Sequence, residues 1–376
     1  MGERGLGTSW TAEEIWQQPA TWPRVAAAVE QVRPRVEGLV GAALADARTR
    51  VVLTGAGTSA FIGEVVAPAL ARHLGRPVET LPTTEVVADP LAAAVDDRPV
   101  LLVSFARSGN SPESLAAAEL LHRLTPGLRH LVITCDPQGE LGRRWAGADD
   151  AVVVALPEET NDRGFAMTSS FTGMALAALL AFGLDVDVDA VAREGTAVLG
   201  EAAERASAIA GAKPARLVYL GSGALRGLAR EAALKSLELT RGEVVGIAES
   251  SLGFRHGPKS VLDDRTIAFV FLSTDPYARS YDVDIARELV QSLGADRVVV
   301  VGDADSGECG GAQVWPVRGS FTSPSVWALV AVITAQTTAL ACSLALDMTP
   351  DNPFPGGEVN RVVQGVVIHE FPDGVS

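Results

Sequence analysis

Short apolar runs alternate with longer amphipathic stretches along most of this chain. The short runs lead into glycine-rich turns, and the longer ones place apolar residues three or four positions apart. The first pattern predicts strands buried on both faces of a sheet, and the second predicts helices that cover it. Their repeated alternation predicts an α/β fold in which parallel sheets are flanked by helices in three layers.

The same order of elements occurs twice. Arg50 begins the run Arg-Val-Val-Leu-Thr-Gly-Ala-Gly-Thr-Ser, and Arg216 begins the run Arg-Leu-Val-Tyr-Leu-Gly-Ser-Gly-Ala-Leu. Each run predicts a buried strand and a Gly-x-Gly turn. Each copy then continues with a helix, a strand, a short β-like run and an apolar helix. In the first copy these are expected at 60–74, 130–134, 151–155 and 168–182. In the second copy they are expected at 225–240, 297–301, 312–317 and 326–346. The chain is therefore predicted to contain a duplicated domain.

Alternating aspartates at 183–189 separate the two copies and lead into a helix expected at about 190–210. Near the start of the chain, Thr11-Ala-Glu-Glu14 has the form of a helix cap before Ile15. We therefore expect an N-terminal helical extension at 1–48, a first domain at 49–185, a second domain at 186–348 and a C-terminal tail at 349–376.

Composition and charge limit the partners. The 376 residues include 31 basic and 46 acidic side chains, giving a net charge of −15. This balance argues against binding to nucleic acid or to an anionic membrane surface. The three cysteines are far apart without metal-ligand spacing, so no metal site is expected.

One segment resembles a membrane span in length. The run from Ser325 to Leu346 is almost entirely apolar, but Gln336 and several hydroxyl residues interrupt it. We interpret it as a buried helix at a core or dimer contact. Since the N-terminus has no apolar run of signal-peptide length, a cytoplasmic location is expected.

A polar loop follows the apolar strand expected at 100–103. It reads Ser104-Phe-Ala-Arg-Ser-Gly-Asn-Ser111, and Pro112 comes next. Pro112 suits the first position of a helix and Ser111 suits its N-cap, so the free helix amides would face the loop and favour an anion. Taken alone, such a loop is more often only a capped turn.

The turn that begins at Gly55 should emerge at the same edge of the sheet, where α/β proteins bind their ligands. The two loops could therefore hold one phosphorylated molecule. A dinucleotide fingerprint is not supported, because Gly55-x-Gly57-x-x-Ala60 lacks an acidic residue about 20 positions later. No nicotinamide cofactor is expected.

Candidate acid–base residues occur in the second copy. Glu231, Lys235 and Glu238 lie at spacings of four and three, which places them on one helix face. His256 lies in a Gly/Pro-rich loop between basic residues, where it could exchange a proton near neutral pH. Solvated ion pairs and a solvated loop histidine are the alternative interpretations of these residues.

Several longer strings carry a family resemblance. Four of them resemble the isomerase half of glucosamine-6-phosphate synthase: Gly57-Thr-Ser59, Arg107-Ser-Gly-Asn-Ser111, the Glu231 to Glu238 helix face and His256-Gly-Pro258. More closely, and nearly end to end, the chain is similar to the tagatose-6-phosphate ketose/aldose isomerase family, also described as galactosamine-6-phosphate deaminase/isomerase. This likeness includes the opening Trp10-Thr-x-Glu-Glu-Ile, Asp162-Arg-Gly-Phe-Ala-Met-Thr-Ser-Ser170 and Asn360-Arg-Val-Val-Gln-Gly-Val-Val-Ile-His369.

The resemblance implies two tandem sugar isomerase (SIS) domains and roles for individual residues. Glu238 matches the carboxylate that moves a proton between C1 and C2. His256 matches the histidine credited with opening the sugar ring, which in that family reaches in from the neighbouring subunit, so a homodimer or larger even oligomer is implied. Together with the turn and loop residues above, the expected substrate-binding set is Gly57, Thr58, Ser59, Ser104, Arg107, Ser108, Asn110, Ser111, Ser169 and Lys235.

Departures from the synthase pattern sharpen the expected reaction. Ala106 replaces a hydroxyl residue, and Val363 and Gln364 stand near the place of a lysine. Gly2 stands where a glutaminase module would present its cysteine. Without an ammonia source, we expect ammonia release from galactosamine 6-phosphate or a related hexosamine 6-phosphate, giving a ketose 6-phosphate such as tagatose 6-phosphate without a cofactor. Plain aldose/ketose isomerisation and a non-catalytic sugar-phosphate sensor are the alternatives.

Overall fold

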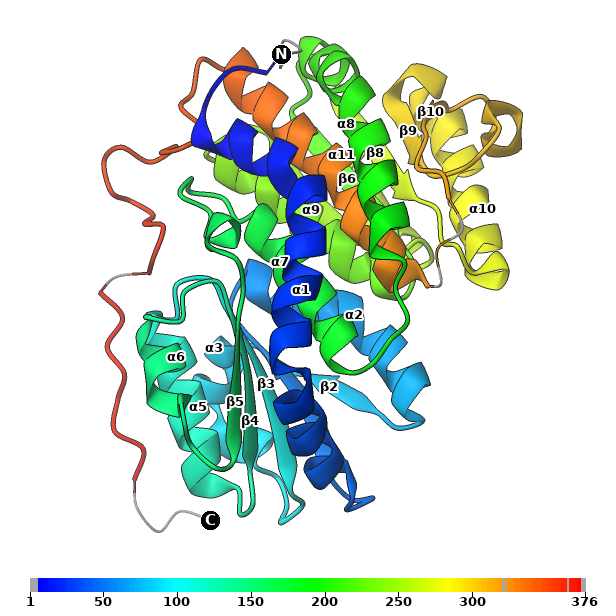
Figure 1. Ribbon diagram of the computed structural model, residues 1–376. Helices are drawn as coiled ribbons and strands as arrows, with labels where there is room; N and C mark the ends of the chain where they lie inside the picture. Colours follow the sequence, from blue (N-terminus) through cyan, green and yellow to red (C-terminus); the bar gives the residue numbers. More distant parts are fainter. Residues whose placement is uncertain (1–5, 320, 322, 364, 373–376) are drawn as a thin grey trace.

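Two five-stranded parallel sheets have the same strand order in the computed structural model, which describes residues 6–319, 321, 323–363 and 365–372 (Figure 1). The first sheet has the order β2-β1-β3-β4-β5, formed by Val78–Thr80, Arg50–Thr54, Val100–Ala106, Arg129–Thr134 and Ala151–Ala155. The second has the order β7-β6-β8-β9-β10, formed by Val245–Glu249, Arg216–Gly221, Thr266–Phe271, Val298–Val301 and Gln313–Trp315. The predicted duplication of an α/β unit is confirmed.

Helices cover both faces of each sheet. The faces that look toward each other are covered by α2 (Thr58–Leu74), α7 (Ser169–Ala181), α9 (Ala224–Leu239) and α11 (Pro324–Ala345), with α1 (Trp10–Leu44) and α8 (Val188–Gly211) alongside. The outer faces carry α3 (Thr83–Ala88), α4 (Pro90–Ala93), α5 (Pro112–Leu124), α6 (Glu140–Trp145) and α10 (Pro276–Leu293). Short 3₁₀ turns complete the fold at Glu158–Thr160, Gly253–Arg255, Pro258–Val261, Ala295–Arg297 and Ser306–Cys309.

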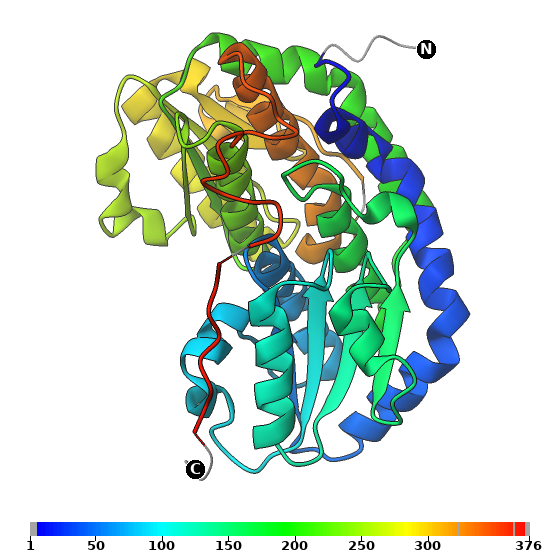
Figure 2. The same ribbon diagram turned by 90° about the vertical axis from the view of Figure 1, so that its left-hand side faces the viewer.

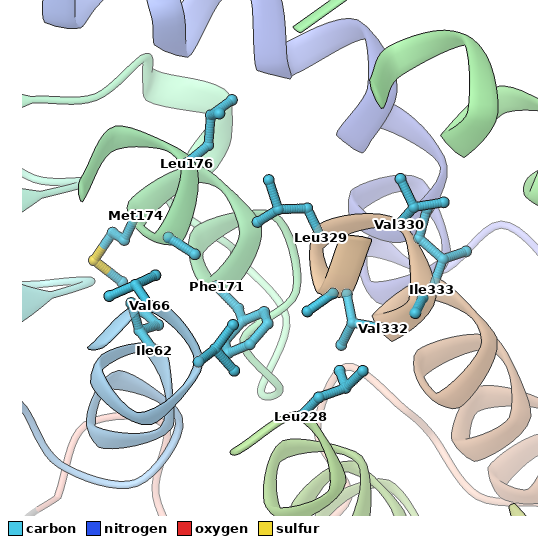
Figure 3. Packing of buried hydrophobic residues seen from close by; sticks show 14 of the residues in the cluster. Ile62, Val66, Phe171, Met174, Leu176, Leu228, Leu329, Val330, Val332 and Ile333 are labelled. Carbon is cyan, nitrogen blue, oxygen red and sulfur yellow. The ribbon is translucent and has the colours of Figure 1, made fainter. Parts of the chain in front are cut away.

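One continuous hydrophobic core joins the two copies. Figure 3 shows side chains of α2, α7, α9 and α11 packed together, including Ile62, Phe171, Leu228 and Leu329. Because α7 and α11 are covered on every side, both helices are apolar all round. Among the described residues, only Pro324–Ala345 is long and apolar enough to cross a membrane, and 89% of its most apolar window is buried in the protein. The interpretation of this segment as a buried helix is confirmed.

The long helix α1 begins differently from the prediction. Its N-cap is Ser9, whose Oγ accepts a hydrogen bond from the backbone N–H of Ala12. Thr11 does not cap the helix, because its N–H and hydroxyl both donate to Asp351 Oδ1 at 2.8 Å. Asp351 also accepts from the Trp10 N–H at 3.0 Å. The first turn of α1 is thus satisfied from the C-terminal tail as well as locally.

A second correction concerns β3, which continues three residues beyond the predicted strand. Ser104 pairs with Thr54 of β1, and Ala106 pairs with Thr134 of β4, so the loop begins only at Arg107. Ser104 has strand partners on both sides, and β4 alone pairs with the strand from there to Ala106; this pairing outweighs the polar character of Ser104. The predicted strand at 151–155 is confirmed without change.

Helices α2 and α9, one from each copy, approach each other closely at Gly227. A Cβ atom added there would lie 2.8 Å from Glu64 Cβ and 2.9 Å from the Val65 backbone nitrogen. Glycine therefore allows the contact, and any larger residue would push the two helices apart. The close approach brings the face of α9 that carries Lys235 against the first turn of α2.

Candidate active site

The first element of the site is the turn between β1 and α2. The chain passes from β1 to β2 on one side and returns to β3 on the other, so a crevice opens between the ends of β1 and β3. Gly57 adopts φ 55° and ψ −126° at the N-cap of α2. A Cβ on Gly55 would lie 2.6 Å from the Ser59 backbone. Both glycines are required to turn the chain and to present the α2 amides to the crevice.

The loop after β3 is the second element. Gly109 has φ 66°, and Pro112 occupies the first turn of α5 as predicted. Ser111 is at the N-cap position, but its side chain does not cap the helix. Its hydroxyl donates instead to Glu113 Oε2 at 2.7 Å. Pro112 has no N–H and the Ser114 N–H donates to the Ser111 carbonyl at 3.1 Å, so the Glu113 N–H is the amide of this turn that can serve another acceptor.

A cavity of about 120 Å³ lies between this turn and this loop. Residues that are far apart in the sequence line it together, and the polar ones are Ser59, Arg107, Ser108, Ser111, Ser114 and Arg361. Four of these were predicted as substrate-binding residues. The departures Ala106 and Val363 also line the cavity, whereas Gln364 lies outside the described residues.

Arg107 connects the cavity to the C-terminal tail. Its Nη1 donates to the Phe165 carbonyl at 3.2 Å, and its Nη2 donates to the Arg361 carbonyl at 2.6 Å. Its Nε–H is buried without a partner among the described residues. Burial lowers the pKa of Arg107, and the nearby Arg361 lowers it further. A buried guanidinium with an unused donor suits an anion better than a neutral ligand.

The tail crosses from the second copy to the first and then runs along α5 (Figure 2, red). Arg361 donates to the Asp162 carbonyl, with its Nε at 3.1 Å. Further along, the Phe371 carbonyl accepts from Arg123 Nη2 at 3.2 Å. The tail therefore forms part of the cavity wall, and Arg361 is a site residue that was not predicted from the sequence.

Other predicted substrate residues lie near the cavity without lining it. Ser104 is buried within β3. Asn110 is exposed, and its Oδ1 accepts from the Glu140 N–H at 3.0 Å. Ser169 faces α1, where its hydroxyl donates to the Glu14 carbonyl at 2.7 Å and accepts from Gln17 Nε2 at 3.0 Å. From the same segment as Ser169, Met167 is the residue that reaches the cavity.

Asp162 holds this segment in place. Its buried carboxylate accepts from the backbone N–H groups of Thr168, Ser169 and Ser170 at 2.7, 3.0 and 2.9 Å. It therefore satisfies the first amides of α7 from outside the helix, since Thr168 makes no side-chain cap. The visible signal was an acidic residue six positions before Thr-Ser-Ser, to which no role was assigned from the sequence.

Three charged side chains of α9 form a buried cluster. Lys235 Nζ lies 2.5 Å from Glu238 Oε2 and 3.4 Å from Glu231 Oε1. Lys235 and Glu231 have no exposed surface, whereas 23% of the Glu238 side chain is exposed. The alternative of solvated ion pairs is therefore wrong. Glu238 is the carboxylate of the cluster that a small molecule can reach.

The charged groups of this cluster affect one another's pKa. Burial by itself would lower the pKa of Lys235, but Glu231 and Glu238 raise it above its ordinary value. Burial raises the pKa of Glu231 to about 7, against the opposite effect of Lys235. Lys235 also donates to Thr58 Oγ1 at 3.0 Å. The cluster in the second copy is thereby joined to the glycine turn of the first.

His256 is not brought to this cluster within the chain. It is exposed at the end of the 3₁₀ turn Gly253–Arg255, and its backbone N–H donates to the Gly253 carbonyl at 2.9 Å. It does not line the cavity beside Arg107. Among the described residues, no group of three or more His, Cys, Asp or Glu side chains could hold a metal ion.

Comparison with known proteins identifies the family. The SIS domain family matches residues 43–183. AgaS of Streptomyces coelicolor is 50% identical over 369 residues, covering 96% of both chains. The D-galactosamine-6-phosphate deaminase AgaS of Escherichia coli is 42% identical over 370 residues, again covering 96% of both. The chain belongs to the AgaS family.

A solved structure extends this result to the whole fold. The tagatose-6-phosphate ketose/aldose isomerase of Escherichia coli superposes on this AgaS-family chain with a TM-score of 0.90 and 39% identity, covering 99% of each chain. The expected tandem SIS architecture is confirmed, because both sheets have the same order and the similarity extends across both.

Proposed function

We propose that this chain is a deaminating isomerase that converts galactosamine 6-phosphate and water to tagatose 6-phosphate and ammonia. The observation that carries the proposal is the position of Glu238. Its partly exposed carboxylate pairs with Lys235, and Lys235 donates to Thr58, the residue before Ser59 of the hydroxyl-rich cavity. An AgaS relative at 42% identity bears the name D-galactosamine-6-phosphate deaminase.

The cavity suits the phosphate end of the substrate. Ser59 and Ser108 supply hydroxyl donors, Arg107 supplies a buried positive charge, and the N-termini of α2 and α5 supply backbone amides. These groups together can bind a dianion in an otherwise acidic protein. The phosphate would fix the sugar so that its C1 and C2 extend toward α9.

In the proposed reaction Glu238 takes the proton from C2 of the ring-opened amino sugar and returns it to C1. The intermediate is an enolamine, and protonation at C1 gives a C2 ketimine. Water then adds to the ketimine carbon, and ammonia leaves as the C2 carbonyl forms. Lys235 and Thr58 hold the carboxylate and the turn in a fixed relation during these transfers.

Ring opening is assigned to His256 of a second subunit. The histidine is exposed on a loop outside the cavity of its own chain. A histidine that enters the cavity of a neighbouring subunit must be exposed in this way. A homodimer or larger even oligomer in the cytoplasm, with the active site at the subunit interface, is part of this proposal. The ketimine step makes the enzyme formally a hydrolase as well as an isomerase.

A second candidate function is isomerisation without deamination, because the structural relative at 39% identity bears the name tagatose-6-phosphate ketose/aldose isomerase. The test is to incubate the purified protein separately with galactosamine 6-phosphate, glucosamine 6-phosphate and tagatose 6-phosphate. Ammonia and ketose phosphate are measured from the amino sugars, and aldose phosphate is measured from tagatose 6-phosphate. The proposal predicts ammonia from galactosamine 6-phosphate. Aldose formation without ammonia from either amino sugar supports the alternative, and binding without turnover indicates a sensor.

A further inference from the structure

The second copy repeats the turn that forms the phosphate cavity in the first. Gly57 and Gly223 have φ and ψ of 55° and −126° and of 58° and −122°. Gly55 and Gly221 both pack against the residue four positions later. A Cβ atom added to either glycine would lie 2.6 Å from that residue. Both turns therefore present helix amides at the same switch point of their sheets.

A buried carboxylate stands at this switch point in the second copy. Asp282 of α10 accepts from Ser222 Oγ at 2.6 Å and from Ser251 Oγ at 2.5 Å through Oδ1. Its Oδ2 accepts from the Ser273 backbone N–H at 2.9 Å. Ser222 belongs to the turn after β6, and Ser273 follows β8. Two of the donors thus come from the strand ends that correspond to those forming the cavity in the first copy.

The first copy has no carboxylate at the matching position. Asp282 lies six residues after Pro276, the first residue of α10, and Ala118 lies six residues after Pro112, the first residue of α5. The connection is also shorter in the second copy. Ser104 pairs with β1 in the first copy, and Val270 pairs with β6 at the equivalent position of the second. Pro112 comes eight residues after Ser104, whereas Pro276 comes only six residues after Val270.

We propose that Asp282 is an internal anion, which takes in the second copy the place that phosphate takes in the first and thereby positions the loop bearing His256. The link to the loop is Ser251, which is fully buried at its start. Six residues further along α10, Glu288 holds the same loop through Arg255, at 2.7 Å, and Lys259. Asp282 is thus a positioning residue, and its effect on turnover rests on the proposed function, whereas its role as an anion does not.

The test replaces Asp282 by the residue of the first copy. In Asp282→Ala, three donors lose their acceptor, so the melting temperature falls. Displacement of the loop lowers kcat by about tenfold to a hundredfold while KM for galactosamine 6-phosphate changes little, because the phosphate cavity is intact. Sodium formate supplies the missing carboxylate and restores both Tm and kcat in a saturable manner, whereas sodium chloride at the same ionic strength does not. The matched control is Asp284→Ala, a carboxylate on the same helix whose side chain is 61% exposed.

Several outcomes decide the proposal. Wild-type Tm and kcat in Asp282→Ala contradict it, and so does a loss that formate fails to restore. If Asp282→Ala does not fold without formate, Asp282→Asn is measured instead. Its amide group cannot accept from all three donors, so kcat must fall while KM is unchanged. A wild-type kcat in this variant overturns the proposal. If the wild-type protein turns over no hexosamine phosphate, the proposed function fails, and the formate dependence of Tm still tests the internal anion.

Discussion

Lys235 of the second copy donates a hydrogen bond to Thr58 of the first copy, with 3.0 Å between Nζ and Oγ1. The same ammonium group pairs with Glu238 at 2.5 Å. Thr58 immediately precedes Ser59, which lines the cavity assigned to phosphate. One buried cation therefore connects the proposed base to the phosphate turn, and neither copy of the duplicated domain contains both parts.

Replacement of Thr58 tests this connection. In Thr58→Val, the buried ammonium group of Lys235 loses an acceptor, which costs about 1–3 kcal/mol of folding stability. Misalignment of Glu238 should also lower kcat by about tenfold or more. Thr58→Ser is the matched control, since it retains the hydroxyl and should retain most of the activity. Equal kcat in the Val and Ser variants, measured by ammonia release, would show that the hydrogen bond has no catalytic role.

Arg107 should determine substrate affinity more than turnover. Lysine carries one nitrogen and cannot reach the carbonyls of Phe165 and Arg361 together while also facing the cavity. We expect Arg107→Lys to raise KM about tenfold, which corresponds to about 1.4 kcal/mol, with a smaller change in kcat. Arg72→Lys, on the exposed side of α2, serves as the control. An unchanged KM in Arg107→Lys would remove Arg107 from the phosphate site.

His130 predicts how stability depends on pH. It is fully buried, stacked on Trp145 with ring centroids 3.5 Å apart, and its Nε2 lies 3.1 Å from His122 Nδ1. Burial, and then the neighbouring His122, lower the pKa of His130 to about 3 from an ordinary value of 6.5. The unfolded chain therefore binds a proton in this range that the folded chain does not, so stability is lost as pH falls from 6.5 toward 3.

Urea unfolding at pH 7, 6, 5 and 4 measures this effect. His130→Gln should lose less stability than the wild-type protein below pH 6.5, by up to about 1.4 kcal/mol per pH unit. Glu14 and Glu231 have pKa values raised to about 7 and act in the opposite direction, but their contribution is common to both proteins. His73→Gln changes an exposed histidine and serves as the control. Parallel wild-type and His130→Gln profiles would contradict the assignment.

The fold was predictable because its strands are continuous apolar runs that end in glycine turns. The duplication was visible at Gly55 and Gly221, and the two sheets do share one strand order. Errors arose where tertiary contacts replaced local signals. Asp351, from the far end of the chain, satisfies the first turn of α1, so Thr11 was mistaken for its cap.

The candidate site was predictable only in part. The string around Arg107 was recognisable, and its Ser108 and Ser111 do line one cavity with Ser59, whereas its Ser104 is buried within β3. Arg361 and Asp162 were missed because their contacts depend on how the tail and the 162–170 segment fold back onto the first copy. The spacing placed Lys235 and Glu238 on one helix face. It could not show that Thr58 of the other copy accepts a hydrogen bond from Lys235.

Ammonia release from galactosamine 6-phosphate, measured for Glu238→Gln beside the wild-type protein, decides whether Glu238 is the base of a deaminating isomerase. The wild-type protein should form ammonia and tagatose 6-phosphate in equal amounts, and Glu238→Gln should lose about 10²–10⁴-fold in kcat with little change in KM. Glu243→Gln, an exposed carboxylate just beyond the end of α9, should behave as wild type. Wild-type ammonia release by Glu238→Gln would show that Glu238 is not the base.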